Sequence, residues 1–311
     1  MADAPSRTRV RMAGALAITL IAVGAAVALV AARGDGFDRA VFAVPGHPTG
    51  LAVAGGQVWI AAPGSGMLTV LDARTGRRSE PSLRTGGAPS RLALGADGVW
   101  VADTARGAVV ALRRSGGAPY PPIPVGSDVA DVALTARAVW AISSAEGVVR
   151  TLEPGGRPVR ALPVGRNPVD IAADGRWVAV ASANDGTLTW IDAAARRVVG
   201  RVHVAGEPVA VAVTGDIAWV ADSSRDTVAR VDLSTGAVGE AIAVGARPIA
   251  VAADGDEVYV LCAGDSKVWH VDGSDISLVR AAGSDPAALA VDADSVWVAD
   301  AGDDAVIRIE R

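Results

Sequence analysis

Residues 206–248 read GEPVAVAVTGDIAWVADSSRDTVARVDLSTGAVGEAIAVGARP. Apolar and polar residues alternate here in four runs, each ended by Gly, Asp or Ser: 209–213, 217–221, 227–231 and the weaker 238–244. Alternation with a period of two, bounded by turn residues, is typical of half-buried β-strands. The stretch therefore predicts four short antiparallel strands joined by tight turns.

This unit recurs along the chain. An anchor residue, proline in all copies but one, begins each copy, and successive anchors lie 38 to 41 residues apart: Pro48, Pro89, Val129, Pro168, Pro208, Pro248 and Pro286. Four residues later every copy has alanine: Ala52, Ala93, Ala133, Ala172, Ala212, Ala252 and Ala290. Eleven residues after the anchor an aromatic residue stands in six of the seven copies: Trp59, Trp100, Trp140, Ala179, Trp219, Tyr259 and Trp297. The constant alanine indicates a crowded innermost strand, where neighbouring sheets converge.

Seven copies of about 40 residues with four strands each are typical of a β-propeller, an all-β fold with radially arranged sheets. The last copy contains only three expected strands, over 287–291, 295–299 and 305–310. Such a copy would leave an open sheet edge. Residues 38–44 (DRAVFAV) resemble the fourth strands of other copies. We therefore predict one seven-bladed domain over 38–311, closed by its N-terminal strand.

The N-terminal region predicts a membrane anchor. Residues 12–32 carry no charged side chain, and 21 residues at about 1.5 Å each are long enough to cross a bilayer core. Arginines precede this segment, so the positive-inside rule places residues 1–11 in the cytoplasm and the propeller outside. We expect a single-pass cell-membrane protein with a short linker, 33–37. A cleaved signal peptide, which would give a secreted protein, is the alternative.

Charge and motif content exclude several classes of function. The net charge is −5, from 29 Lys and Arg against 34 Asp and Glu, which disfavours wrapping a phosphate backbone. We therefore expect no nucleic-acid partner. The single cysteine, Cys262, rules out an internal disulfide. No phosphate-binding loop, zinc-spaced Cys/His pair or nucleophile elbow occurs, so we expect no cofactor and no metal.

The repeat carries a family resemblance. The run WVAD at 219–222 and the strand VARVD at 228–232 resemble the YVTN-type repeat, in which a Tyr-Val-x-Asn run precedes a Val-x-Val-Ile-Asp-like strand. The second motif recurs as VLD at 70–72, WID at 190–192 and HVD at 270–272. Trp replaces Tyr and Asp replaces Asn in the clearest copies. The resemblance covers all seven copies and implies the propeller architecture rather than one activity.

The chain is also similar to two other propeller groups. Resemblance to the streptogramin B lyase type implies a His and Glu constellation with magnesium at the centre of one face. The histidines of this chain, His47, His203 and His270, are expected in a loop and on outer strands, so no catalytic residue is carried over. The other group is the extracellular propeller sensor of bacterial membrane kinases, but residues 1–11 hold no kinase domain.

Three successive copies carry a charged residue two positions after the anchor, where the other four copies have Gly or Ala. The residues at this position are Gly50, Arg91, Asp131, Asp170, Ala210, Ala250 and Ala288. This position shares a strand face with the constant alanine, so Arg91, Asp131 and Asp170 are expected to line one arc of the central funnel mouth. An arginine fork at such a mouth suits carboxylate recognition. Three loop residues of the same sector complete the candidate ligand site: Arg106, Glu146 and Arg166. The alternative is a set of mutually satisfying charges that plugs the funnel.

We call the face formed by the loops from fourth to first strands and from second to third strands the top face. The opposite, bottom face is expected to lie toward the membrane. The sequence predicts a noncatalytic binding or interaction module whose top face holds an unknown protein, peptide or cell-wall ligand. The alternative is a lyase- or hydrolase-type enzyme that uses the funnel carboxylates, with or without a divalent metal.

Overall fold

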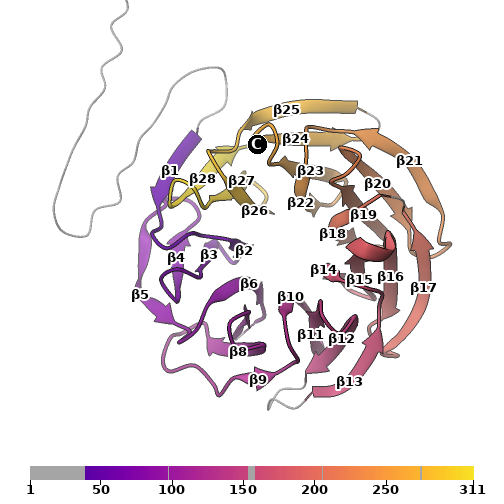
Figure 1. Ribbon diagram of the computed structural model, residues 1–311. Coiled ribbons are helices and arrows are strands. Elements are labelled where there is room, and N and C mark those ends of the chain that lie inside the picture. Colours follow the sequence, from indigo (N-terminus) through magenta and orange to yellow (C-terminus); the bar gives the residue numbers. More distant parts are fainter. Residues whose placement is uncertain (1–38, 97, 153–157, 205, 274) are drawn as a thin grey trace, which may run out of the picture.

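The computed structural model describes five stretches of the chain: 39–96, 98–152, 158–204, 206–273 and 275–311. Within them 28 strands form seven four-stranded antiparallel sheets, which surround a central axis (Figure 1). The predicted all-β, seven-bladed propeller is thereby confirmed. The expected tail, membrane helix and linker, 1–37, lie outside the described residues. No helix in the described stretches is long and apolar enough to cross a membrane.

Each blade runs from an innermost first strand to an outermost fourth strand. Blade 1 consists of β2 (Gly50–Ala54), β3 (Gln57–Ala62), β4 (Met67–Asp72) and β5 (Arg78–Arg84). Blade 2 consists of β6 (Pro89–Leu94), β7 (Gly98–Asp103), β8 (Ala108–Arg113) and β9 (Ile123–Pro124). Blade 3 consists of β10 (Val129–Thr135), β11 (Ala138–Ser143), β12 (Val148–Leu152) and β13 (Pro158–Pro163). Blades 4 and 5 are β14 (Pro168–Asp174), β15 (Trp177–Ser182), β16 (Thr187–Asp192) and β17 (Arg197–His203); and β18 (Pro208–Thr214), β19 (Ile217–Asp222), β20 (Thr227–Asp232) and β21 (Val238–Ala243). Blades 6 and 7 are β22 (Pro248–Asp254), β23 (Glu257–Cys262), β24 (Lys267–Asp272) and β25 (Asp275–Ala281); and β26 (Pro286–Val291), β27 (Ser295–Asp300), β28 (Ala305–Glu310) and β1 (Arg39–Ala43).

The N-terminal strand closes the ring as predicted. β1 pairs antiparallel with β28 from Arg39 opposite Ile309 to Ala43 opposite Ala305. Phe42 of β1 is 2% exposed, and its ring centroid lies 6.0 Å from that of Trp297 on β27. The first and last segments of the propeller therefore share one blade and one apolar core.

The repeated aromatic position packs one blade against the next. Trp59 of blade 1 belongs to an apolar cluster with Val99 and Val101 of blade 2. In blade 4, where Ala179 holds the repeated position, Trp177 two residues earlier lies in a cluster with Val211 and Val220 of blade 5. Burial of these large side chains between sheets is what holds the blades together, since each sheet exposes an apolar face that it cannot cover alone.

The aspartate that ends the second strand holds the loop entering its blade. Asp300 is 1% exposed and accepts hydrogen bonds from the backbone N–H groups of Ser284 and Asp285, at 3.0 and 2.9 Å. Asp103 and Asp222 accept equivalent bonds from their own entry loops. Blade 6 has Cys262 at this position, where burial raises the pKa of the thiol to about 12. The thiol is thus a buried, protonated core group.

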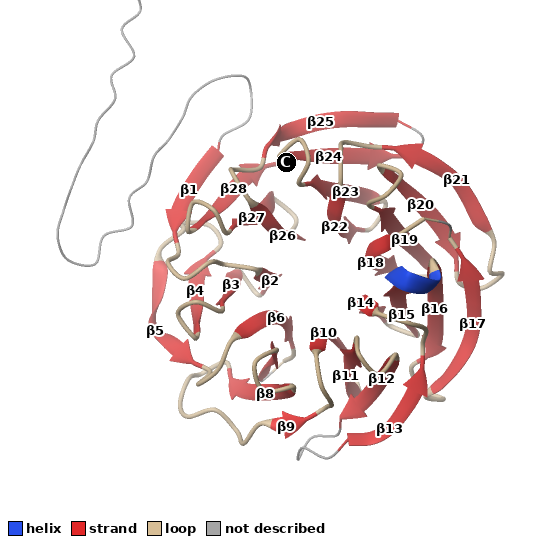
Figure 2. Cartoon of the chain, in the orientation of Figure 1, coloured by secondary structure: helices blue, strands red, loops and turns tan. Residues whose placement is uncertain are grey.

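Two blades depart from the regular repeat. The fourth strand of blade 2, β9, is only two residues long, because residues 118–124 (APYPPIP) are rich in proline, which cannot donate to a strand ladder. Blade 4 carries the short 3₁₀ helix η1 (Ala183–Asp185) in its top loop, drawn in blue in Figure 2. Both departures lie beside depressions in the surface.

Candidate functional site

The three charged residues of the funnel lie where the repeat predicts them. Arg91, Asp131 and Asp170 stand near the start of β6, β10 and β14, the innermost strands of blades 2, 3 and 4. Each follows a register shift in the pairing of first and second strands. A β-bulge of this kind re-aims the side chains next to it.

The two carboxyl groups contact each other. Asp131 is 7% exposed and shares a side-chain hydrogen bond with Asp170. Burial, the negative charge of Asp170 and this hydrogen bond raise the pKa of Asp131 well above its usual value, and the positive charge of Arg91 only partly opposes them. A hydrogen bond between two carboxyl groups needs one proton. The surroundings of Asp131 therefore favour its neutral, protonated form.

The same three residues also connect neighbouring blades. Asp170 accepts a hydrogen bond of 2.6 Å from the backbone N–H of Val211 in blade 5. Arg91 donates to the backbone carbonyl of Thr49, which precedes blade 1. The cluster therefore links the inner strands of consecutive blades, and it also places a guanidinium and a carboxyl pair at the top of the axis.

The three predicted loop residues do not join this cluster. Arg106 pairs with the buried Asp103 of its own blade at 3.1 Å. Glu146 pairs with Arg150 at 2.5 Å, and this contact lowers the pKa of the Glu146 carboxyl. The loops that carry Arg106 and Glu146 join second to third strands, so they lie at a larger radius than the first strands. The structure therefore does not bring the six predicted residues together in one contact cluster.

Glu146 and Arg166 meet instead in a rim depression of about 780 Å³ between blades 3 and 4. Arg166 is 78% exposed and is held by Asp185 of η1, which accepts from its backbone N–H at 2.7 Å and from its Nε at 2.6 Å. These hydrogen bonds lower the pKa of the Asp185 carboxyl. The polar neighbours of this depression were not identified from the sequence: Asp128, Ser144, Asn167, Asn184, Asp185 and Arg201.

The funnel cluster does not fit a magnesium site. Mg²⁺ favours several oxygen ligands in an octahedral arrangement. Here two carboxyl groups lie beside a guanidinium, and burial favours the neutral form of Asp131. Among the described residues, no group of three or more His, Cys, Asp or Glu side chains is placed to hold a metal ion. The arrangement suits hydrogen bonding and proton transfer.

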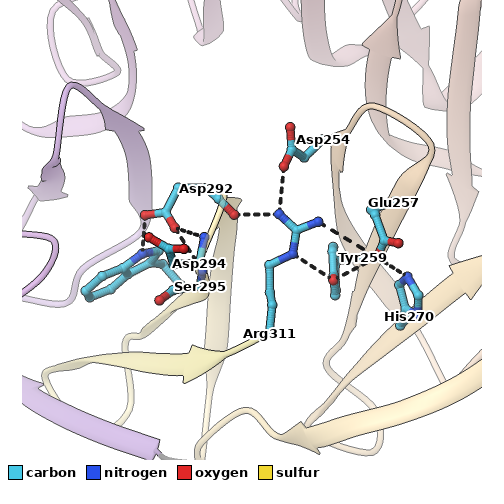
Figure 3. A network of polar contacts seen from close by, with 9 residues as sticks. Asp254, Glu257, Tyr259, His270, Asp292, Asp294, Ser295 and Arg311 are labelled. Carbon is cyan, nitrogen blue, oxygen red and sulfur yellow. Dashed lines mark hydrogen bonds and ion pairs between the residues drawn. The ribbon is translucent and has the colours of Figure 1, made fainter.

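A second polar network lies on the bottom face between blades 6 and 7 (Figure 3). Arg311, just after β28, donates to the Tyr259 hydroxyl at 3.0 Å and to Asp254 at 2.7 Å, both in blade 6. Nε2 of His270 lies 2.6 Å from Glu257, and its ring stacks on Tyr259 with centroids 4.9 Å apart. As expected, His270 is on a third strand away from the axis. The network links blade 7 to blade 6.

Comparison with known proteins identifies the fold. No protein-family model and no curated protein matches this chain by sequence, so membership of the YVTN-type family is not confirmed. Virginiamycin B lyase from Staphylococcus aureus superposes with a TM-score of 0.76 at 14% identity, over 89% of this chain and 100% of that one. A streptogramin B lyase gives 0.76 at 15% identity, over 88% and 97%. Hydrazine synthase of Kuenenia stuttgartiensis gives 0.74 at 16%, over 86% and 96%. The chain is thus a β-propeller related in fold to the streptogramin B lyase-like propellers.

Proposed function

We propose that this propeller is a binding module whose ligand enters the top of the central funnel and is held by Arg91, Asp131 and Asp170. The supporting observation is the carboxyl pair of Asp131 and Asp170 beside Arg91, on three successive innermost strands. The other four blades have Gly or Ala at that repeat position. Convergent polar groups in an otherwise small-residue surface are the usual composition of a ligand site.

The charges indicate the class of ligand. A guanidinium binds carboxylates through two parallel hydrogen bonds, and an aspartate pair with one negative charge accepts from an ammonium or hydroxyl group. A zwitterionic peptide or cell-wall peptide fragment presents both groups. We therefore propose a ligand of that class, bound without chemical change.

Affinity measured by calorimetry against a panel of short zwitterionic peptides tests this proposal. Asp170→Asn keeps a carbonyl acceptor for the Val211 N–H but removes the negative charge, and should weaken binding. Asp174→Asn is the matched control, because Asp174 lies on the same strand and accepts the Gly215 N–H at 2.8 Å at the opposite end of the channel. Equal effects of the two substitutions, or no saturable binding of any peptide, would reject the funnel as the site.

The second candidate is a lyase- or hydrolase-type enzyme that uses the same carboxyl groups. The observation that favours it is the raised pKa of Asp131 next to the Asp170 carboxyl, since an aspartate that keeps its proton can act as a general acid. Solved structures of similar fold include a catalytically inactive virginiamycin B lyase with quinupristin. Incubation with quinupristin followed by mass spectrometry distinguishes hydrolysis, which adds water, from elimination, which opens the ring without a change of mass. Turnover that is lost in Asp131→Asn supports the enzyme, and binding without turnover supports the binding module.

We also propose that residues 12–32 hold the propeller at the outer face of the cell membrane, with its bottom face toward the lipid. The support is the uncharged segment and the arginines that precede it. Cell fractionation with N-terminal sequencing tests this. Recovery from culture medium with a new N-terminus near Arg33 would show a secreted protein instead.

A further inference from the structure

Blade 2 contains an interruption of the repeat on the bottom face. Six blades have four strands of ordinary length, but β9 pairs with β8 only at Ala108 and Val109. Beyond this point the chain turns away, and the backbone N–H of Tyr120 donates to Ala111 at 2.9 Å in place of a continued ladder. The outer edge of the blade therefore ends early.

This interruption exposes an aromatic side chain that the other blades bury. Trp59, Trp140, Trp219 and Trp297 are at most 7% exposed at the repeated position, and Tyr259 is 5% exposed. Trp100 alone among the described residues at this position is partly exposed. Its partner across the strand pair is Ala111, whereas other blades place larger residues there: Val70, Thr151, Trp190, Arg230, His270 and Arg308. A short fourth strand and a small partner together leave space beside the indole.

The space is a groove with a volume of about 1450 Å³. It crosses the bottom ends of blades 2 and 3 and reaches the turn after β14. Its walls combine aromatic, proline and leucine side chains: Trp100, Tyr120, Pro121, Pro122, Leu94 and Leu134. Tyr120 is 44% exposed and lies beside the partly exposed Trp100 in this groove, so the two rings form one accessible aromatic surface.

The groove is positively charged although the chain is negative. The charged groups that line it are Arg113, Arg114, Arg137 and Asp174. Asp174 accepts the Gly215 N–H, and Arg114 donates to the Ala54 carbonyl and to Gln57. The Arg113 guanidinium lies 4.8 Å from the centre of the Tyr120 ring. Arg137 is exposed and forms no ion pair with the residues that the structure describes.

We propose that this groove binds an amphipathic organic anion, in which an aromatic or otherwise apolar body lies against Trp100 and Tyr120 and a carboxylate contacts Arg137. An anion is favoured because three arginines line the groove and its one aspartate, Asp174, already accepts a backbone hydrogen bond. The aromatic and apolar walls favour a flat aromatic group over a strongly hydrated one. This site is on the opposite face from the funnel and does not depend on the function proposed for it.

Photolabelling of the full chain with benzophenone-4-carboxylate tests the proposal. The excited ketone inserts into a nearby C–H bond: the ketone carbon bonds to that carbon and its oxygen takes the hydrogen. Mass spectrometry should place the label on the groove, at Leu94, Trp100, Tyr120 or Leu134, with saturable dose dependence. Benzophenone-4-carboxamide, which lacks the charge, should label these residues more weakly.

Substitutions then measure separately the contribution of the Arg137 charge and that of the Tyr120 ring to binding. Arg137→Gln should raise the half-saturating concentration about fivefold, while Arg137→Lys should retain most of the binding. Tyr120→Ala should raise it about five- to tenfold. Both side chains are exposed, so unchanged melting temperatures will show that the variants fold. Arg230→Gln and Leu278→Ala are the matched controls, since both side chains are exposed and lie away from the groove.

Three results would overturn the proposal. One is labelling that does not saturate or that is spread along the chain. Another is saturable labelling centred on the funnel residues near Asp131. The third is equal labelling by the carboxamide and indifference to Arg137→Gln, which would show that no anion site exists in the groove.

Discussion

Asp131 and Asp170 lie on adjacent innermost strands and share a hydrogen bond at the top of the funnel. Burial and the negative charge of Asp170 raise the pKa of Asp131 well above its usual value, so Asp131 keeps its proton to a higher pH than an exposed aspartate does. The pair is therefore a contact between blades 3 and 4 whose strength depends on pH.

Stability should depend on pH through this pair. The folded pKa of Asp131 is raised above its usual 3.8, so the stabilisation is complete below about pH 4 and is lost as pH rises through the folded pKa. Asp131→Asn keeps a donor toward Asp170 and does not titrate. Urea unfolding should show the variant gaining on the wild type as pH rises from about 4 to 8. If the stability difference between the variant and the wild type stays constant over this pH range, the pKa of Asp131 is not raised in the folded protein.

Closure of the ring should depend on Phe42. This side chain is 2% exposed and packs on Trp297 across the seam between the two ends of the propeller. Phe42→Ala should lower the free energy of unfolding by about 3–5 kcal/mol. Val238→Ala, on a 40% exposed fourth-strand position, is the control and should cost less than about 0.5 kcal/mol. Deletion of 38–44 should expose β28 and cause aggregation, measured by light scattering; a monomer with unchanged melting temperature would show that closure does not matter.

The aspartate that ends the second strand in blades 2, 5 and 7 should be a structural group. Asp300→Ala removes the buried carboxylate that accepts from the backbone N–H groups of Ser284 and Asp285, and should cost about 1–3 kcal/mol. The neighbouring Asp303→Ala alters an exposed side chain and should have little effect. Chemical denaturation of both variants checks this. Similar losses in the two would show that the buried hydrogen bonds contribute little.

Arg311 should contribute a smaller, salt-sensitive amount to stability at the contact between blades 6 and 7. Its side chain is 15% exposed, but its partner Asp254 is 51% exposed, so solvent screens the pair. Arg311→Ala should lower the free energy of unfolding by about 1 kcal/mol at low ionic strength and by less in high salt. Melting curves at two salt concentrations measure this. An effect that does not change with salt would point to packing on Tyr259 instead.

The repeat made most of the fold predictable from the sequence. The period near 40 residues, the constant alanine and the aromatic position fix the blade number and the strand order, because every copy must present the same faces to its neighbours. The three-strand last copy predicted the pairing of β1 with β28. The placement of Arg91, Asp131 and Asp170 followed from the same register.

The rest depends on contacts between copies, which a repeat pattern does not specify. The hydrogen bond between Asp131 and Asp170 joins different blades, and the loops that carry Arg106 and Arg166 extend outward by amounts set by their own side-chain pairs. The groove beside Trp100 could have been suspected from the proline run at 118–124 and from Ala111, where other copies have larger residues. Both signals are departures of one copy from the repeat, and such a departure does not by itself show whether a groove forms or neighbouring side chains fill the space.

Substitution of Arg91 tests whether the funnel cluster is a ligand site or a set of charges that plugs the funnel. Its guanidinium already donates to the Thr49 carbonyl, so Arg91→Ala should lower both stability and affinity and cannot decide between them. Arg91→Lys keeps the positive charge and a donor but loses the planar fork that binds a carboxylate through two hydrogen bonds. We expect this variant to change the free energy of unfolding by less than about 1 kcal/mol and to weaken a carboxylate-bearing ligand by about 2 kcal/mol, some 30-fold in Kd. Calorimetric titration and chemical denaturation of the same preparation measure the two quantities. A stability loss larger than the affinity loss would show that Arg91 serves the ring rather than a ligand.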